Sequence, residues 1–359
     1  MKRIDRDPLR FDTFALFARF LQKEKLPLGE EEGLRRFVKK VRESAEEATK
    51  SEGFLFGQRT ESLFEMVVAS LGHVKFLKQE DLGDVFYQLP DDLQVPDFRV
   101  VFGDDVHAFV EVKNVHQVDA PLVRGAREVE RLANYARLMK CELFFATFWS
   151  RWGMWTLVRE QHLAREGNKR VLTLEKAFTL NEMALVGDLF VATRAPLRVC
   201  VETLPVSKGP AERRGKKGGK QPLKVQSVGF YTENGRITDP VELRIADFIV
   251  FYGRWPAGDV IIERDTDGGI TAVEFSYAPP PEASHQEAQG CDGIGSLSEM
   301  LSRAFRDTTT RGDEVIATRA DFVPGEYRDF IPPDFFFVKR RVLPLWVFRL
   351  APKDTAAAD

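Results

Sequence analysis

The sequence predicts an α/β fold, in which a sheet is flanked by helices, followed by a second, α+β region. Three patterns predict the first part. Apolar residues at helical spacing end at Gly72, two short apolar runs at 98–102 and 106–110 enclose a turn, and a second helical stripe at 121–140 leads into strand-like runs. Helices that alternate with strands in this way are typical of a sheet with helices packed on its faces.

Length and breaks in composition divide the chain. With 359 residues it is long enough for two domains, and its 43% hydrophobic content is ordinary for a folded protein. We predict a helical N-terminal segment at 1–50, a core domain at 51–165, a connector at 166–224, an α+β domain at 225–350 and a disordered tail at 351–359.

The core is predicted to open with a helix. Apolar residues from Leu63 to Leu71 follow helical spacing, Thr60 or Ser62 could cap the start, and Gly72 ends the helix. A strand region is expected to follow.

The next element is a predicted β-hairpin. Apolar residues alternate at 98–102 and 106–110, and the Gly-Asp-Asp sequence between them favours a tight turn. Glu111 and Lys113 lie at the end of the second strand, two residues apart, so their side chains point to one face. Because the hairpin folds back on itself, Asp97 is expected to lie beside them.

Two carboxylates and a lysine at one end of a sheet suit a hard divalent cation. Mg²⁺ is usually bound by one or two carboxylates together with waters and substrate phosphates, and Mn²⁺ accepts the same oxygen ligands. Glu61 or Glu65, one turn apart on the preceding helix, could reach the same place. A metal there would lower the pKa of a bound water, so the predicted reaction is hydrolysis of a phosphodiester.

The alternative is an exposed hairpin on which Glu111 and Lys113 are ordinary cross-strand partners. Their position inside an otherwise apolar strand argues against this, because an unpaired charge in a buried strand is costly.

One helix is predicted over residues 121–140, with Pro121 in its first turn. Arg124, Arg127 and Arg131 would form a basic face suited to a phosphate backbone. The alternative is a solvated face on which neighbouring glutamates balance these arginines.

Over roughly residues 55–158 the chain resembles the PD-(D/E)xK nuclease superfamily, which includes restriction enzymes, archaeal Holliday-junction resolvases and RecB-like nucleases. Pro96-Asp97 matches the proline–aspartate pair, Glu111-Val112-Lys113 the last motif, and Glu61 the helix acid. The resemblance implies a restriction-endonuclease-like mixed sheet flanked by helices. It also implies Asp97, Glu111 and Glu61 as carboxylates on the metal, and Lys113 as the residue that orients the attacking water.

Charge is concentrated locally. A net charge of −3 excludes a protein that coats nucleic acid through an overall positive charge. Any binding of nucleic acid must therefore come from local basic patches. One basic patch lies at 206–224 and includes Lys216 and Lys217. Frequent glycine and proline predict a flexible loop there, which either holds a phosphate backbone or only solubilises a linker.

The C-terminal part alternates strand-like and helical patterns. Strand-like runs also end the core at 142–148 and 153–158. Beyond residue 225 we predict strands at 245–252, 259–263, 270–277 and 313–318, a helix at 297–305, and a pair of strands over 335–350. This part is expected to select a substrate, bind a ligand or partner protein, or mediate oligomerisation.

The expected compartment is the cytoplasm. Three widely spaced cysteines form neither a zinc nor a disulfide pattern, no apolar run reaches membrane-spanning length, and the N-terminus lacks a signal peptide.

The sequence therefore predicts a nuclease dependent on Mg²⁺ or Mn²⁺. Double-stranded DNA is the expected partner, restriction, defence or repair the expected role, and a homodimer would suit double-strand cleavage. One alternative is a nuclease fold that binds DNA without cutting it. The other is an effector nuclease, acting on RNA or DNA, that a ligand of the C-terminal domain controls.

Overall fold

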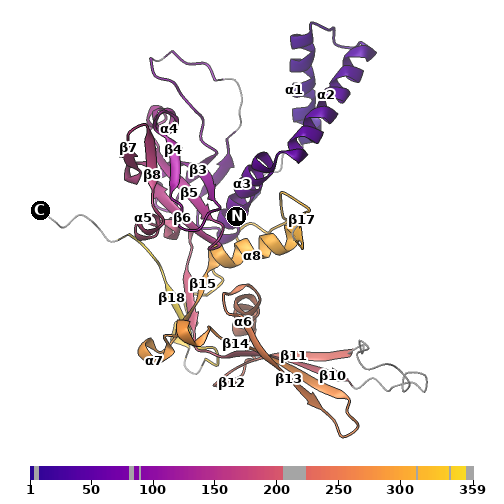
Figure 1. The fold of residues 1–359 in the computed structure, drawn as a ribbon, viewed down its shortest axis with the longest axis vertical. Coiled ribbons are helices and arrows are strands. Elements are labelled where there is room, and N and C mark those ends of the chain that lie inside the picture. Colours follow the sequence, from indigo (N-terminus) through magenta and orange to yellow (C-terminus); the bar gives the residue numbers. More distant parts are fainter. Residues whose placement is uncertain are drawn as a thin grey trace, which may run out of the picture.

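The computed structural model describes residues 1–3, 8–80, 85–88, 90–204, 224–312, 314–338 and 341–352. Nearly all of the predicted basic loop, with Lys216 and Lys217, lies outside the described residues, as does the predicted tail from residue 353. A helical hairpin projects from a core of sheet and helices, and a second region carries its own large sheet (Figure 1).

The helices and strands are as follows in chain order. The first half contains α1 (Pro8–Glu24), α2 (Glu31–Lys50), α3 (Glu52–Leu71), β1 (Phe76–Gln79), β2 (Phe98–Val101), β3 (His107–Val115), β4 (Leu122–Gly125), α4 (Ala126–Leu138), β5 (Glu142–Trp149), β6 (Met154–Arg159), β7 (Ala164–Glu166), β8 (Lys169–Leu172) and α5 (Leu174–Thr179). The second half contains β9 (Phe190–Thr193), β10 (Leu197–Leu204), β11 (Lys224–Thr232), β12 (Gly235–Arg236), α6 (Pro240–Tyr252), β13 (Ala257–Arg264), β14 (Ile270–Tyr277), α7 (Gln286–Gln289), β15 (Asp292–Ser296), α8 (Leu297–Thr309), β16 (Thr310–Arg311), β17 (Glu314–Val315) and β18 (Leu345–Phe348).

The core sheet is mixed, with strand order β1-β2-β3-β5-β6. The first three strands run antiparallel, β3 and β5 run parallel, and β5 and β6 form a second antiparallel pair. Alternate side chains of β3 face opposite sides. Val110 packs with the buried face of α3, and Phe109 packs with that of α4. The predicted sheet flanked by helices is confirmed, as are the hairpin of β2 and β3 and the strands β5 and β6.

Helix α3 begins earlier than predicted. The Ser51 hydroxyl accepts a hydrogen bond from Phe54 N at 3.4 Å and caps the helix, so neither Thr60 nor Ser62 is its cap. Both of those residues lie in the middle of α3 with buried side chains, and so the neighbouring Glu61 also lies in mid-helix. The predicted end is confirmed, since Gly72 takes a left-handed φ of 69° after Leu71.

The predicted helix over residues 121–140 is wrong in its first turn. Residues Leu122–Gly125 form β4, which pairs antiparallel with β8, and the helix starts only at Ala126. Leu122 is buried by this pairing, and Arg124 lies opposite Arg170. Pairing with a strand that is distant in sequence, from Gly125↔Lys169 to Leu122↔Leu172, outweighs the local helical pattern, because propensity is a weak constraint where tertiary contacts are available.

The second region has a five-stranded antiparallel sheet with strand order β12-β11-β10-β14-β13. A three-stranded sheet, β15-β9-β18, connects it with the core. The predicted strands near 259–263 and 270–277 and the helix near 297–305 are confirmed as β13, β14 and α8. Where the chain divides into independent domains stays a prediction.

Two predictions for this region are wrong. Residues 245–252 form part of α6, because the Asp239 carboxylate caps the helix through Val241 N and Glu242 N and Pro240 occupies its first turn. In the described residues of the segment 335–350, namely 335–338 and 341–350, there is a 3₁₀ turn at Phe335–Phe337 and one strand, β18. The strand predicted at 313–318 is confirmed in part, since β17 covers Glu314–Val315 of its described residues, 314–318.

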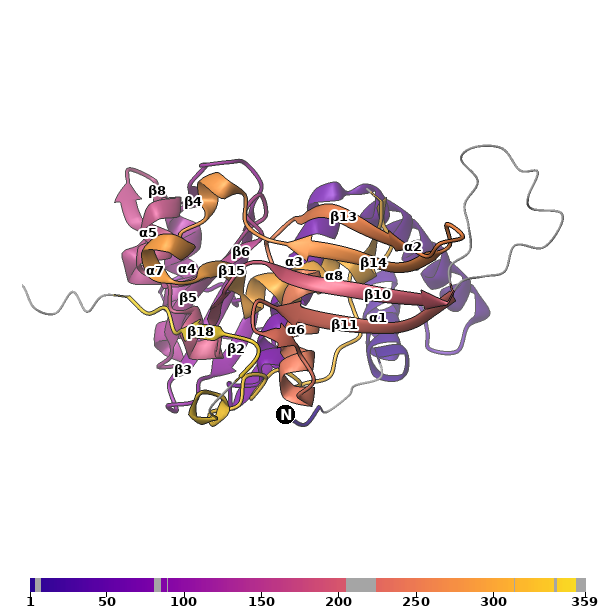
Figure 2. The same cartoon turned by 90° about the horizontal axis from the view of Figure 1, so that it is seen from below.

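Helix α8 lies between the core and the second region. It contacts α3 and β6 on one side and α6 on another (Figures 1 and 2). Met300, Leu301 and Phe305 are buried there, and Ser302 Oγ accepts a hydrogen bond from Trp155 Nε1 at 3.0 Å. One apolar core therefore runs from α3 through α8 to α6. No helix in the described ranges is long and apolar enough to cross a membrane.

Candidate active site

Asp97 is held at the start of β2 by two hydrogen bonds. Its main-chain oxygen accepts from Glu80 N at 2.9 Å, and its Oδ2 accepts from Val112 N at 2.7 Å. The second bond attaches the carboxylate to β3 between the two residues whose side chains share its site. The hairpin thus brings Asp97 beside Glu111 and Lys113, as the sequence pattern predicts.

Lys113 bridges the two carboxylates. Its Nζ lies 2.6 Å from Glu111 Oε1 and 3.9 Å from Asp97 Oδ2. The Glu111 side chain is only 4% exposed, whereas about a fifth of Asp97 and of Lys113 reaches solvent. The cluster therefore has a buried floor and an accessible rim.

Burial dominates the electrostatics of the two acids. It raises the pKa of Glu111 to about 7, with the Asp97 charge adding to the rise and Lys113 opposing it. Burial likewise raises the pKa of Asp97, against the charge of Lys113 and the hydrogen bond from Val112 N. Both carboxyls therefore gain from any added positive charge.

Glu111 has an oxygen that nothing in the described chain satisfies. Its Oε2 is buried and has no hydrogen-bond partner there, although Oε1 is paired with Lys113. A buried carboxylate oxygen without a partner is costly, and a divalent cation coordinated by Glu111 and Asp97 would satisfy it. The donor set, oxygen only, fits Mg²⁺ or Mn²⁺.

Of the two helix carboxylates, Glu61 faces the cluster. Burial and then the charge of Asp97 raise its pKa, and Lys113 lowers it. Its Oε2 accepts a hydrogen bond from Gln79 Nε2 at 3.0 Å. Glu65 instead lies 3.6 Å from Arg319. Within the described residues no three carboxylate, histidine or cysteine side chains gather closely enough to hold a metal, so Glu61 lies beside the pair without completing a three-ligand set.

The three arginines predicted to form one helix face do not do so. Arg124 lies on β4 and pairs with Glu128, Arg127 lies on α4 and binds Asp92 at 2.7 Å, and Arg131 binds Gln94 at 2.8 Å. Arg124 is nevertheless near the site, because its charge lowers the pKa of Asp97.

Thr147 was not singled out from the sequence. It pairs in register with Lys113 across β3 and β5, is fully buried, and its Oγ1 has no partner in the described structure. The available signal was a hydroxyl residue inside the apolar run of β5.

Comparisons with known proteins give likenesses among solved structures alone. No family model matches the chain, and no curated protein matches it. Among solved structures, the chain is similar to Hjc, a Holliday junction resolvase from the archaeal hyperthermophile Archaeoglobus fulgidus, with 22% identity over 36% of this chain and 95% of that one, at a TM-score of 0.28. A likeness at this TM-score carries no weight for function, so the geometry of the site has to carry it.

Proposed function

We propose that this chain is a metal-dependent nuclease that hydrolyses phosphodiester bonds, with DNA as substrate. The supporting observation is the buried, unpartnered Oε2 of Glu111 beside Asp97 and Lys113. Asp97 and Glu111 would hold Mg²⁺ or Mn²⁺, which when bound supplies an activated water and offsets charge on the phosphate. The preference for DNA over RNA, and a role in restriction, defence or repair, follow only from the family resemblance.

The chain's own groups have distinct roles in this proposal. The hydrogen bond from Val112 N holds Asp97 in position, and burial of Glu111 keeps water from competing for its free oxygen. The Lys113 ammonium, partly exposed beside both acids, lies where it orients a water or stabilises charge developing on a phosphate oxygen. Glu61 adds negative charge at the rim, and Arg124 lies near enough to contact substrate phosphates.

Cleavage assays test the proposal. Purified full-length protein is incubated with linear duplex, supercoiled plasmid, branched DNA, single strands and RNA, each with Mg²⁺, Mn²⁺ or a chelator. We expect cleavage of DNA only with metal. Asp97→Asn, Glu111→Gln and Lys113→Ala should each lower the rate at least about a hundredfold, as expected for loss of a group that acts in the transition state.

Glu142→Gln is the matched control, because Glu142 is a half-exposed carboxylate on β5 of the same sheet whose one ion pair within the described part of the chain is with Arg159. Its rate should equal that of the unmodified protein. Wild-type rates in all three site variants would refute the site. Binding of DNA without metal, with no cleavage of any substrate, would identify a nuclease fold kept for binding alone.

A further inference from the structure

A cavity of about 630 Å³ lies where the core meets α6 and α8. Its wall includes the N-terminal half of α3, the end of β3, the turn between β5 and β6, the end of α6, and α8. The cavity is distinct from the Asp97–Glu111 pair, although Thr60 and Asn114 in its wall are chain neighbours of Glu61 and Lys113. Its volume lies in the range of small-ligand sites, roughly 300–1,000 Å³.

The wall of this cavity is strongly basic. The described residues that line it include no aspartate or glutamate, but they include five arginines: Arg59, Arg151, Arg254, Arg303 and Arg306. We call this the arginine cavity. Arg254 and Arg303 share the buried carboxylate of Glu299, at 2.6 Å and 2.8 Å. The other three arginines form no salt bridge to a carboxylate anywhere in the described chain.

The positive charges of the arginines in this cavity repel one another. Burial, and after it the charge of Arg306, lower the pKa of Arg59. Burial also lowers the pKa of Arg303; the charges of Glu299 and, less strongly, Asp307 oppose that fall, and those of Arg254 and Arg306 add to it. Arg59 is held in place, since it donates to Thr309 Oγ1 at 2.7 Å and lies over the Phe305 ring. An anion in the cavity would relieve this repulsion.

The remaining wall has aromatic rings and a free acceptor. Trp152 is 49% exposed, and Phe56 and Phe251 are exposed as well. Asn114 donates through Nδ2 to Thr60 Oγ1, whereas its buried Oδ1 has no partner in the described structure. Rings offer a stacking surface to a base, and an unpartnered amide oxygen accepts a hydrogen bond from a base amine or a sugar hydroxyl.

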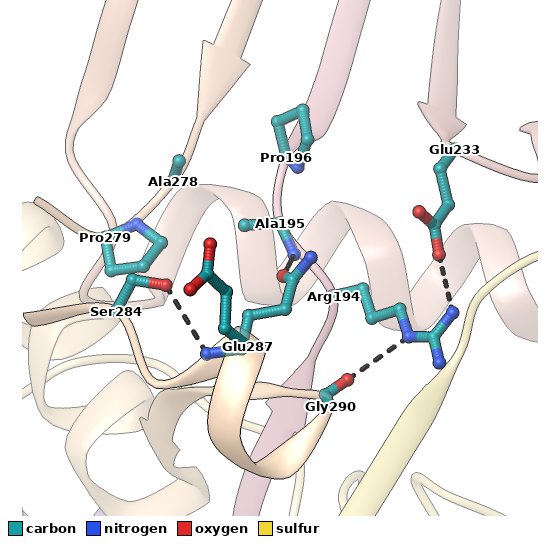
Figure 3. Close-up of a pocket in the computed structure, with 10 residues that line it drawn as sticks. Arg194, Ala195, Pro196, Glu233, Ala278, Pro279, Ser284, Glu287 and Gly290 are labelled. Atoms are coloured by element: carbon teal, nitrogen blue, oxygen red, sulfur yellow. Dashed lines mark hydrogen bonds and ion pairs between the residues drawn. The ribbon is translucent and has the colours of Figure 1, made fainter. Parts of the chain in front are cut away.

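In another cavity of similar size, about 610 Å³, the arginine of the wall is paired (Figure 3). There Arg194 is bound to Glu233 and to Gly290 O, and Ala195 N donates to Gln286 Oε1. Those polar groups satisfy one another, whereas the guanidinium groups of Arg151 and Arg306 in the arginine cavity have no such partner among the described residues. Size alone therefore does not distinguish the two cavities, but free charge does.

We propose that the arginine cavity binds a nucleotide, with its phosphate on the arginines and its base against the exposed rings. Guanidinium groups form paired, charge-assisted hydrogen bonds with phosphate oxygens. The nucleotide comes either as a free molecule or as one unit of a strand. Because the wall joins α3 and β3 with α6 and α8, such a ligand would contact both regions of the molecule.

Calorimetric titration of the full chain tests the proposal, with chelator present so that no cleavage takes place. The probes are adenosine and guanosine mono- and triphosphates, the unphosphorylated nucleosides, and a 5′-phosphorylated single-stranded DNA tetranucleotide. We expect a phosphorylated probe to bind, the nucleosides to bind at least about tenfold more weakly, and the fluorescence of Trp152 to change. Binding of the free nucleotides identifies a diffusible ligand, and binding of the tetranucleotide alone identifies a strand.

Variants separate this site from general electrostatics. Arg151→Ala with Arg306→Ala should weaken binding at least about tenfold, because two charge-assisted contacts are lost, and Arg306→Lys should restore part of it. Arg264→Ala removes the same charge from β13, outside the cavity, and should bind as the unmodified chain does. Thermal unfolding checks that each variant is folded. Failure of every phosphorylated probe to bind, or equal binding by the double variant and Arg264→Ala, overturns the proposal.

Discussion

At the scale of single residues, Glu111 is held in an unfavourable state. The strand around it is apolar, its side chain is buried, and only one of its two oxygens has a partner in the described structure. Asp97 adds negative charge on the same side. Strain of this kind is typical of a site built for a ligand that supplies the missing charge.

The raised pKa of Glu111 makes stability depend on pH when no metal is bound. The folded state holds the Glu111 proton up to a pKa of about 7, against 4.5 for the free side chain. The stability that this bound proton contributes is therefore fully present below pH 4.5. It is lost as the pH rises to about 7, which lowers the free energy of unfolding by at most about 3 kcal/mol. Glu111→Gln lacks this contribution.

Urea denaturation in chelator, at steps between pH 4.5 and 8, measures the effect. The stability of Glu111→Gln relative to the unmodified chain should rise across this window. Glu65→Gln, on the neighbouring helix, serves as the control and should track the unmodified chain. Parallel profiles for all three would contradict the assigned pKa and the burial that causes it.

The sequence patterns predicted some contacts of single residues and not others. The spacing of Asp97, Glu111 and Lys113 was sufficient to predict that they meet, because a hairpin is a local structure and alternation along a strand is geometric. The partners of Arg124, Arg127 and Arg131 were not predictable in the same way. Two of them, Asp92 and Gln94, lie in an irregular segment whose path no local pattern determines.

At the scale of elements, the end of α3 is fixed by close packing. Gly72 has a left-handed φ of 69°, and a Cβ there would lie 2.7 Å from Gly325 Cα. Gly325 N donates to Ala69 O at 2.7 Å, so the two segments are bonded as well as packed. Gly72, predicted only as the end of a helix, therefore also allows a C-terminal loop that is distant in sequence to pack against the core.

Gly72→Ala should therefore destabilise the protein. The left-handed conformation costs an alanine about 1–2 kcal/mol, and main-chain contact at 2.7 Å adds to it, for a total of at least about 2 kcal/mol. Gly57→Ala is the matched control in the same helix, because nothing lies within 4 Å of its Cβ position. It should stabilise by up to about 1 kcal/mol. Equal midpoints in chemical denaturation would contradict this account of Gly72.

The sequence pattern of some elements predicts one secondary structure, whereas that of others is compatible with two. Helices α2 and α8 and strand β14 were predictable because one periodicity dominates each segment. The run 245–252 is apolar except for Asp247, and apolar runs do not distinguish a strand from a buried helix. The cap at Asp239-Pro240 was the decisive local signal, and the i, i+3, i+4 burial of Ile245, Phe248 and Ile249 agrees with it.

At the scale of the whole molecule, the core and the second region share one apolar interior. Phe64 and Trp155 of the core contact each other, and the Trp155 indole donates to Ser302 of α8. Arg59 of α3 donates to Thr309 at the end of α8. The core therefore packs against a helix that follows it by well over a hundred residues.

A chain cut after residue 204 should lose cooperative unfolding. Removing α8 exposes the buried face of α3 and β6, including Trp155, and burial of one large side chain is worth about 1.5–3 kcal/mol. Scanning calorimetry and circular dichroism of the truncated and full chains provide the measurement. A truncated chain that unfolds in one sharp transition within a few degrees of the full chain would show that the core is independent. If that chain also cut DNA faster, the C-terminal region would be an inhibitor.

The sequence by itself determined what depends on neighbours along the chain. It specified the hairpin, the shared face of Glu111 and Lys113, the stop at Gly72 and the helix–strand order of the core, because periodicity and turn chemistry act over a few residues. Only the tertiary structure decided that β4 replaces a helical turn, that α8 completes the core, and that five arginines surround one cavity. Those outcomes depend on which distant segments compete to bury the same surface, and that competition is settled by packing rather than by local pattern.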